Sequence, residues 1–141
     1  MPIPQPGDVL SYAYLWSHEA DRGQEEGLKD RPVAVVVARL TGRGLTELIV
    51  LPVTHRQPDE AADGMEMPKA IKRNLGLDSA RSWIMLSEVN RFVWPGPDIR
   101  PATKEGAPTY GALPDWFFLK LRDQVAERLG RGKLRDLKRS Q

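Results

Sequence analysis

Apolar and β-branched residues gather in two runs near the middle of the chain, and polar residues stand where each run begins or ends. The first run, residues 32–38, has no polar face, so we expect a strand covered on both sides. Pro32 lacks an N–H group, which suits the start of a strand better than its middle. The second run, residues 48–53, leads directly into Thr54. If the two strands are neighbours in one small sheet, Arg31 and Thr54 meet at its rim.

The rest of the pattern predicts short strands joined by turns that are rich in glycine and proline. The expected strands cover residues 9–16, 31–38, 46–53, 65–67, 83–86 and 89–94. Residues 17–30 and 98–113 are expected to be loops, and residues 69–76 one or two helical turns. These elements leave one segment long enough for a full helix.

That helix is expected over residues 114–130, with Pro114 in its first turn and Gly130 as its stop. Its predicted buried stripe consists of Phe118, Leu121, Val125 and Leu129. The basic residues after it, 131–141, are expected either to contact RNA or to fray.

Length and element order predict a single domain over residues 1–141. The expected fold is mainly β with α: a small SH3-like barrel over about residues 5–95, followed by the helix and the basic tail. An OB-like barrel is the nearest alternative.

Composition excludes several classes of site. The chain has no cysteine, so it has neither disulfides nor thiolate metal sites, and with only two histidines we expect no histidine-rich zinc site. No metal or cofactor is therefore expected. No apolar run approaches the roughly 18 residues of a membrane span, and no secretory leader is recognisable, so a cytoplasmic protein is expected. A net charge of +2 permits nucleic-acid binding without requiring it.

Four segments, in this order, resemble the MazF/PemK toxins of type II toxin–antitoxin modules. They are Pro-Gly-Asp-Val at residues 6–9, a Gly-Gln-Glu-Glu-Gly loop at 23–27 that leads to Arg31-Pro32 and the valine run, Val-Leu-Pro-Val-Thr at 50–54, and residues 82–92. The resemblance implies an SH3-like barrel of the kind also found in CcdB, a homodimer, and metal-independent cleavage of single-stranded RNA. It also implies a partner antitoxin that covers the RNA groove.

Transferred residue by residue, the resemblance assigns the loop arginine to Arg31 and the strand-end threonine to Thr54. A histidine that contributes in some members corresponds to His18. An arginine can grip two phosphate oxygens with its forked guanidinium, and a threonine hydroxyl can donate to the same phosphate. Candidates for the general base are His55, His18 and the loop carboxylates, with Glu25 among them.

Five further basic residues are predicted to contact RNA phosphates: Arg56, Lys69, Lys72, Arg73 and Arg91. The alternative for the cluster at 69–73 is an ordinary solvated helix face. Two alternatives to nuclease function stay open. One is a barrel of the same fold that binds RNA or a protein target without catalysis, as the gyrase-poisoning relatives do. The other is an inactive homologue.

Overall fold

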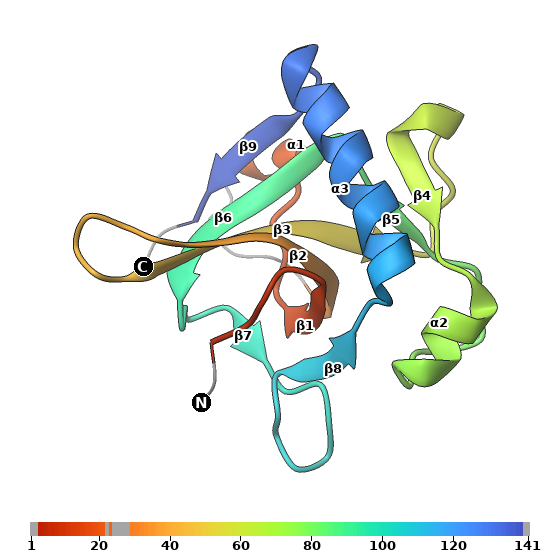
Figure 1. Ribbon diagram of the computed structural model, residues 1–141, viewed down its shortest axis with the longest axis horizontal. Coiled ribbons are helices and arrows are strands. Elements are labelled where there is room, and N and C mark those ends of the chain that lie inside the picture. The colour runs from red at the N-terminus through yellow and green to blue at the C-terminus, as the bar shows by residue number, and fades with distance from the viewer. Residues whose placement is uncertain (1–2, 22, 24–28, 140–141) are drawn as a thin grey trace.

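A computed structural model describes residues 3–21, 23 and 29–139 of the chain (Figure 1). The first half contains β1 (Asp8–Tyr12), α1 (Ser17–Asp21), β2 (Arg31–Leu40), β3 (Thr46–Thr54), the short 3₁₀ turn η1 (Ala61–Asp63) and β4 (Gly64–Glu66). The second half contains α2 (Lys69–Asn74), β5 (Trp83–Met85), β6 (Glu88–Trp94), β7 (Ile99–Arg100), β8 (Thr109–Ala112), α3 (Asp115–Gly130) and β9 (Arg135–Lys138).

Within these described ranges the strands form one sheet whose ladders do not close into a ring. The main path runs β4-β5-β3-β2-β1-β7, and β6, β8 and β9 attach beside it. β3 changes partner along its length, because residues 46–50 pair with β6 whereas Val53 and Thr54 pair with β5. All ladders are antiparallel except that of β6 with β9. The prediction of a mainly β fold with helices is confirmed.

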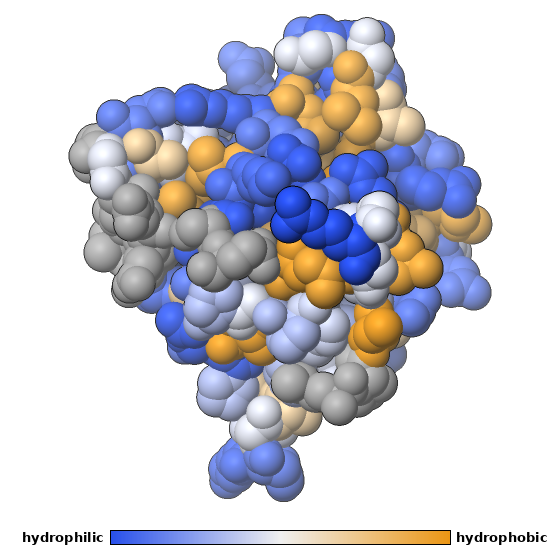
Figure 2. Space-filling model, turned by 90° about the vertical axis from the view of Figure 1, so that its left-hand side faces the viewer, coloured by the Kyte–Doolittle hydropathy of each residue, from blue (hydrophilic) through white to orange (hydrophobic). Residues whose placement is uncertain are grey.

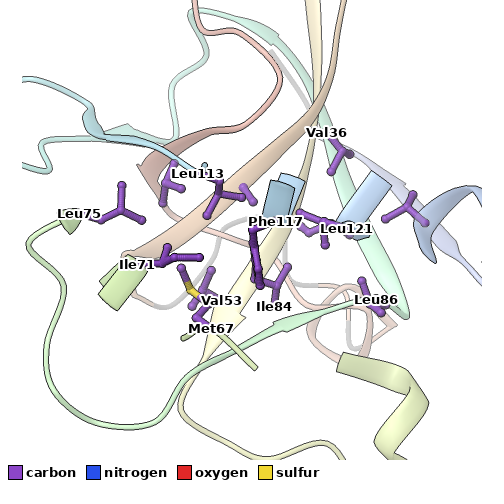
Figure 3. Close-up of a cluster of buried hydrophobic side chains, with 14 of the residues drawn as sticks. Val36, Val53, Met67, Ile71, Leu75, Ile84, Leu86, Leu113, Phe117 and Leu121 are labelled. Carbon is purple, nitrogen blue, oxygen red and sulfur yellow. The ribbon is translucent and has the colours of Figure 1, made fainter. Parts of the chain in front are cut away.

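Both faces of β2 and β3 are buried, as the unbroken apolar runs predict. Val33 and Val35 pack with Tyr12 and Phe92 on one face of the sheet. Ala34 and Val36 face the other cluster, to which α2 and α3 contribute. Figure 3 shows Phe117 and Leu121 of α3 beside Ile71, Val53 and Ile84 in this second cluster. Helix α3 thus seals one side of the sheet, as Figure 1 also shows.

Helix α3 has the predicted bounds to within one residue, but its buried stripe differs. Phe117, Leu121 and Val125 are buried, whereas Phe118 is only half-buried and Leu129 is 61% exposed. Successive steps of four residues advance about 40° beyond a full turn. The stripe therefore rotates off the core before it reaches Leu129.

Two loop predictions are wrong, because residues 98–113 contain β7 and β8, and residues 17–21 form α1. Of the two alternatives for the basic tail, fraying is contradicted for residues 135–138, which form β9, a parallel partner of β6. The first strand is also shorter than predicted, since β1 ends at Tyr12. β7, β8 and β9 each depend on a distant partner strand, which local sequence does not reveal.

The β2–β3 hairpin projects from the body of the sheet at the left of Figure 1. Its tip exposes Leu40 and Leu45, with 75% and 47% of their surface open to solvent. Figure 2 views the molecule from this side and shows hydrophobic patches interspersed with hydrophilic surface. No helix among the described residues is long and apolar enough to cross a bilayer.

Candidate functional site

Arg31 and Thr54 stand at the ends of neighbouring strands. β2 and β3 are antiparallel, and their ladder brings Val33 opposite Pro52. The same register, continued by two residues, brings Arg31 opposite Thr54. The guanidinium Nη1 of Arg31 donates to the Val53 carbonyl over 3.4 Å, which agrees with this placement. The strand register therefore places Arg31 and Thr54 next to each other at the rim of the sheet, as predicted.

Two hollows lie on either side of this pair. The larger, of about 590 Å³, is lined by Trp16, His18 and Arg56 among others. The smaller, of about 310 Å³, is lined by His55 and Asp78 among others. Arg31, Thr54 and Lys29 line both. A cation and a hydroxyl thus form the shared wall of two adjoining hollows.

Arg31 is half-buried and poorly satisfied. Its guanidinium carbon lies 5.0 Å from the centre of the Trp16 ring, within the range of a cation–π contact. Its Nε is buried and has no hydrogen-bond partner, and no carboxylate of the described residues lies within 4.0 Å of its nitrogens. Burial lowers the pKa of Arg31, and the nearby charge of Glu19 opposes that shift. The group stays charged, because an arginine begins far above neutrality.

Thr54 has a hydroxyl that is only partly used. Its Oγ1 accepts a hydrogen bond from the backbone N–H of Arg56 over 3.2 Å. That bond fixes the side chain and leaves the hydroxyl hydrogen free for a ligand oxygen.

His55 is held by a carboxylate. Its Nε2 lies 2.8 Å from Oδ2 of Asp78, and Oδ1 of the same carboxylate accepts from Lys72 Nζ over 2.8 Å. Lys72 is 4% exposed and also donates to Ser82 Oγ and to the Ala80 carbonyl. All three hydrogens of its ammonium group are therefore occupied. We exclude Lys72 from the set of phosphate contacts, because a buried and fully bonded ammonium cannot reach RNA.

His18 lies in the larger hollow on α1, with its ring 6.3 Å from that of Trp16. Its neighbour Glu19 is buried and accepts from the Trp16 backbone N–H over 3.0 Å. Glu25 lies outside the described residues. The two histidines thus line different hollows, His18 one and His55 the other.

The remaining predicted RNA contacts are dispersed. Arg56 lines the larger hollow, whereas Lys69 and Arg73 are exposed on α2 beside a third hollow. Arg91 lies on β6 and pairs with Asp136 at 3.2 Å and Glu47 at 3.6 Å, and it lines none of the hollows. The structure therefore brings Arg56 to Arg31 and Thr54 but not Arg91.

Residue types alone did not identify two contributors to the site. Glu88 is buried at the larger hollow, where it accepts from the Tyr14 hydroxyl over 3.2 Å and from the Ser17 backbone N–H over 2.9 Å. Burial, followed by the charge of Glu88, raises the pKa of Tyr14 well above its ordinary value. Asp78 is the second contributor. It follows α2 in the chain, and only the fold brings its carboxylate to His55. Neither residue lies in a recognisable spacing with its partner.

No group of three or more metal-ligating side chains is found together among the residues that the structure describes. No known family model matches the chain, and no curated protein matches it.

Proposed function

We propose that the protein is a metal-independent endoribonuclease of the MazF/PemK type, acting on single-stranded RNA as the toxin of a type II toxin–antitoxin module. In this proposal the bent sheet is an SH3-like barrel, the chain works as a cytoplasmic homodimer, and a cognate antitoxin covers the cleft. The observation that carries the proposal is the shared wall formed by Arg31 and Thr54 between two hollows.

The chemistry fits these two groups. RNA is cleaved when its 2′-hydroxyl attacks the adjacent phosphorus and the 5′-oxygen leaves. The phosphorane that forms carries extra negative charge on its non-bridging oxygens. Arg31 supplies a fixed cation for those oxygens and Thr54 supplies a hydroxyl donor. Donors that are preorganised at a developing oxyanion typically contribute about 3–4 kcal/mol each.

Among the described residues, Arg31 has no carboxylate partner, and such an arginine supports an anionic ligand. Its guanidinium stacks on Trp16 and faces open volume, and its one hydrogen bond within the described ranges is a long one to the Val53 carbonyl. The larger hollow is also lined by the partly exposed ring of Trp16, on which an unpaired base can stack. Single-stranded RNA combines both features, a phosphate and an exposed base.

The test is cleavage of a panel of labelled single-stranded RNAs by purified protein in EDTA. Wild type is expected to yield 2′,3′-cyclic phosphate and 5′-hydroxyl ends. Arg31→Ala is expected to lower the rate about 10²–10³-fold. Arg43→Ala serves as the matched control, because Arg43 is exposed in the β2–β3 turn and lines none of the hollows.

Absence of cleavage across the panel, or equal cleavage by Arg31→Ala, would overturn the nuclease proposal. RNA binding without cleavage would instead favour the non-catalytic barrel. Growth arrest on expression that survives Arg31→Ala and Thr54→Ala would favour a protein target.

A further inference from the structure

The smaller hollow contains a histidine whose orientation is determined by a carboxylate. Because the Asp78 carboxylate can only accept, the 2.8 Å contact requires the hydrogen of neutral His55 to sit on Nε2. The other ring nitrogen, Nδ1, is then an unprotonated acceptor. A histidine in this tautomer, held by an anion, is ready to take a proton.

The carboxylate is itself fixed by two donors. Lys72 Nζ donates to Oδ1 of Asp78 over 2.8 Å, and the backbone N–H of Ala80 donates to the same oxygen over 3.2 Å. Oδ2 is left for His55. The Lys72 hydrogen bond is the main reason why the pKa of Asp78 lies below its usual value, so the carboxylate remains charged through the neutral range.

Lys72 is buried and hydrogen-bonded, so it can hold the Asp78 carboxylate in a fixed position. Its side chain is 5% exposed against 57% for Asp78, and its ammonium is also bound by Ser82 Oγ over 2.7 Å. Few lysines are this buried, and those that are require a partner. The chain of contacts runs from a buried cation, through one carboxylate, to an imidazole at the edge of a hollow.

The same hollow is lined by Arg31 and Thr54, the two groups assigned to the phosphate. The charged and titratable side chains that line it around His55 are Lys29, Asp30, Arg31, Lys72, Asp78 and Tyr110. Among them only Asp78 is within ion-pair distance of the imidazole. His55 thus places an imidazole next to the phosphate-binding pair.

We propose that His55 is the general base of this cleavage and that Asp78 and Lys72 are its positioning residues. This inference rests on the proposed nuclease function. Nδ1 of His55 takes the proton of the 2′-hydroxyl while O2′ forms its bond to phosphorus. The bond from phosphorus to O5′ breaks, and the leaving oxygen takes a proton from water. The imidazolium then neutralises the resulting hydroxide, which returns the enzyme to its starting state.

The decisive experiment is the pH dependence of single-turnover cleavage by the full chain. The wild-type rate is expected to rise with pH along one limb between about pH 5 and 8, as imidazole loses its proton. His55→Gln is expected to lower the rate about 10²–10⁴-fold and to abolish the limb. Its affinity for an uncleavable RNA with a 2′-deoxy substitution at the cleaved position should stay within about twofold, since a base contributes little to ground-state binding.

Asp78→Asn separates positioning from a merely structural role. The amide keeps an acceptor for Nε2 but removes the charge that stabilises imidazolium, so the limb should move to lower pH while the maximal rate falls. Asp123→Asn is the charge-matched control, because Asp123 is exposed on α3 and lines none of the hollows. The control should leave both limb and rate unchanged.

A second measurement does not need cleavage. ¹⁵N spectra of histidine report the tautomer, and His55 should show the Nε2–H form in wild type and lose that preference in Asp78→Ala. If wild type cleaves RNA and His55→Gln cleaves it with the same rate and pH profile, the base assignment is wrong while the nuclease function stands. If wild type cleaves no RNA, both proposals fall. An unchanged tautomer in Asp78→Ala would remove the positioning role alone.

Discussion

Two arginines, each beside an aromatic ring, have opposite surroundings in this protein. Arg139 is 3% exposed and follows β9. Its Nη1 donates to the Ala13 carbonyl and to Asn90 Oδ1, and its Nη2 lies 2.7 Å from an Asp98 oxygen. Arg31 is only half-buried, yet one of its nitrogens has no partner and no carboxylate of the described chain neutralises it.

The difference separates a structural cation from a functional one. Arg139 lies 5.4 Å from the Tyr12 ring and Arg31 lies 5.0 Å from the Trp16 ring, so aromatic contact does not distinguish them. The two arginines are distinguished by how completely their guanidinium groups are hydrogen-bonded. Burying a cation is unfavourable unless it is paired, so we expect the half-buried Arg31 to bind an anion at the cleft. If that anion is an RNA phosphate, replacing the two arginines should have different effects on stability and on RNA binding.

Replacing Arg139 should have the largest effect on stability. Arg139→Ala leaves the buried Asp98 carboxylate without its cation, which typically costs about 3–5 kcal/mol of unfolding free energy. Urea denaturation measures it. Lys138→Ala, an exposed neighbour, should stay within about 0.5 kcal/mol of wild type. A loss below about 1 kcal/mol in Arg139→Ala would contradict the structural role.

Replacing Arg31 should act on RNA binding and not on the fold. Arg31→Ala removes an unpartnered buried nitrogen together with the Trp16 contact, and these effects oppose each other. The unfolding free energy should therefore change by less than about 1 kcal/mol. The slope of log affinity against log salt, measured with the uncleavable RNA, should fall by about 0.7, the value for one phosphate of a single strand. A stability loss as large as that of Arg139→Ala would remove the contrast.

The Trp16 ring should contribute less than the charge it covers. Trp16→Leu keeps apolar volume but removes the aromatic face beneath Arg31. A half-exposed cation–π contact is worth about 0.5–1 kcal/mol, so affinity for the same RNA should fall about two- to fivefold. Fluorescence anisotropy measures the change. Loss of binding altogether would mean that Trp16 acts mainly by stacking an RNA base and not by supporting Arg31, and equal binding would mean that Arg31 needs no aromatic support.

The smallest effect concerns Asp78, whose partners are one buried cation and one exposed imidazole. Its lowered pKa means that the carboxylate stabilises the fold above its unfolded pKa of about 3.9, and that this contribution is lost as pH falls through the lower folded pKa. Between about pH 5 and 2, wild type should therefore lose more stability than Asp78→Asn does. Solvent screening keeps the difference below about 1 kcal/mol. Urea midpoints at both pH values test it, and identical losses would contradict the pairing.

The long elements of the fold follow from local sequence. β2, β3 and α3 have apolar patterns that extend over several turns or strand residues, and their predicted bounds agree with the structure to within a few residues. β7, β8 and β9 carry no such pattern. They are strands because β1 and β6 offer free ladder positions to them. Short strands of this kind are decided by their partners and not by propensity.

The sequence by itself determined that an arginine and a threonine stand where two apolar strands begin and end, because β-branched runs and a proline mark those boundaries. Only the tertiary structure decided what surrounds them. Strand register set Arg31 opposite Thr54, and the chain after α2 carried Asp78 to His55. Packing turned Lys72 inward and left Arg31 without a carboxylate partner from the described part of the chain. Such pairings join residues from separate elements, so no spacing along the chain encodes them.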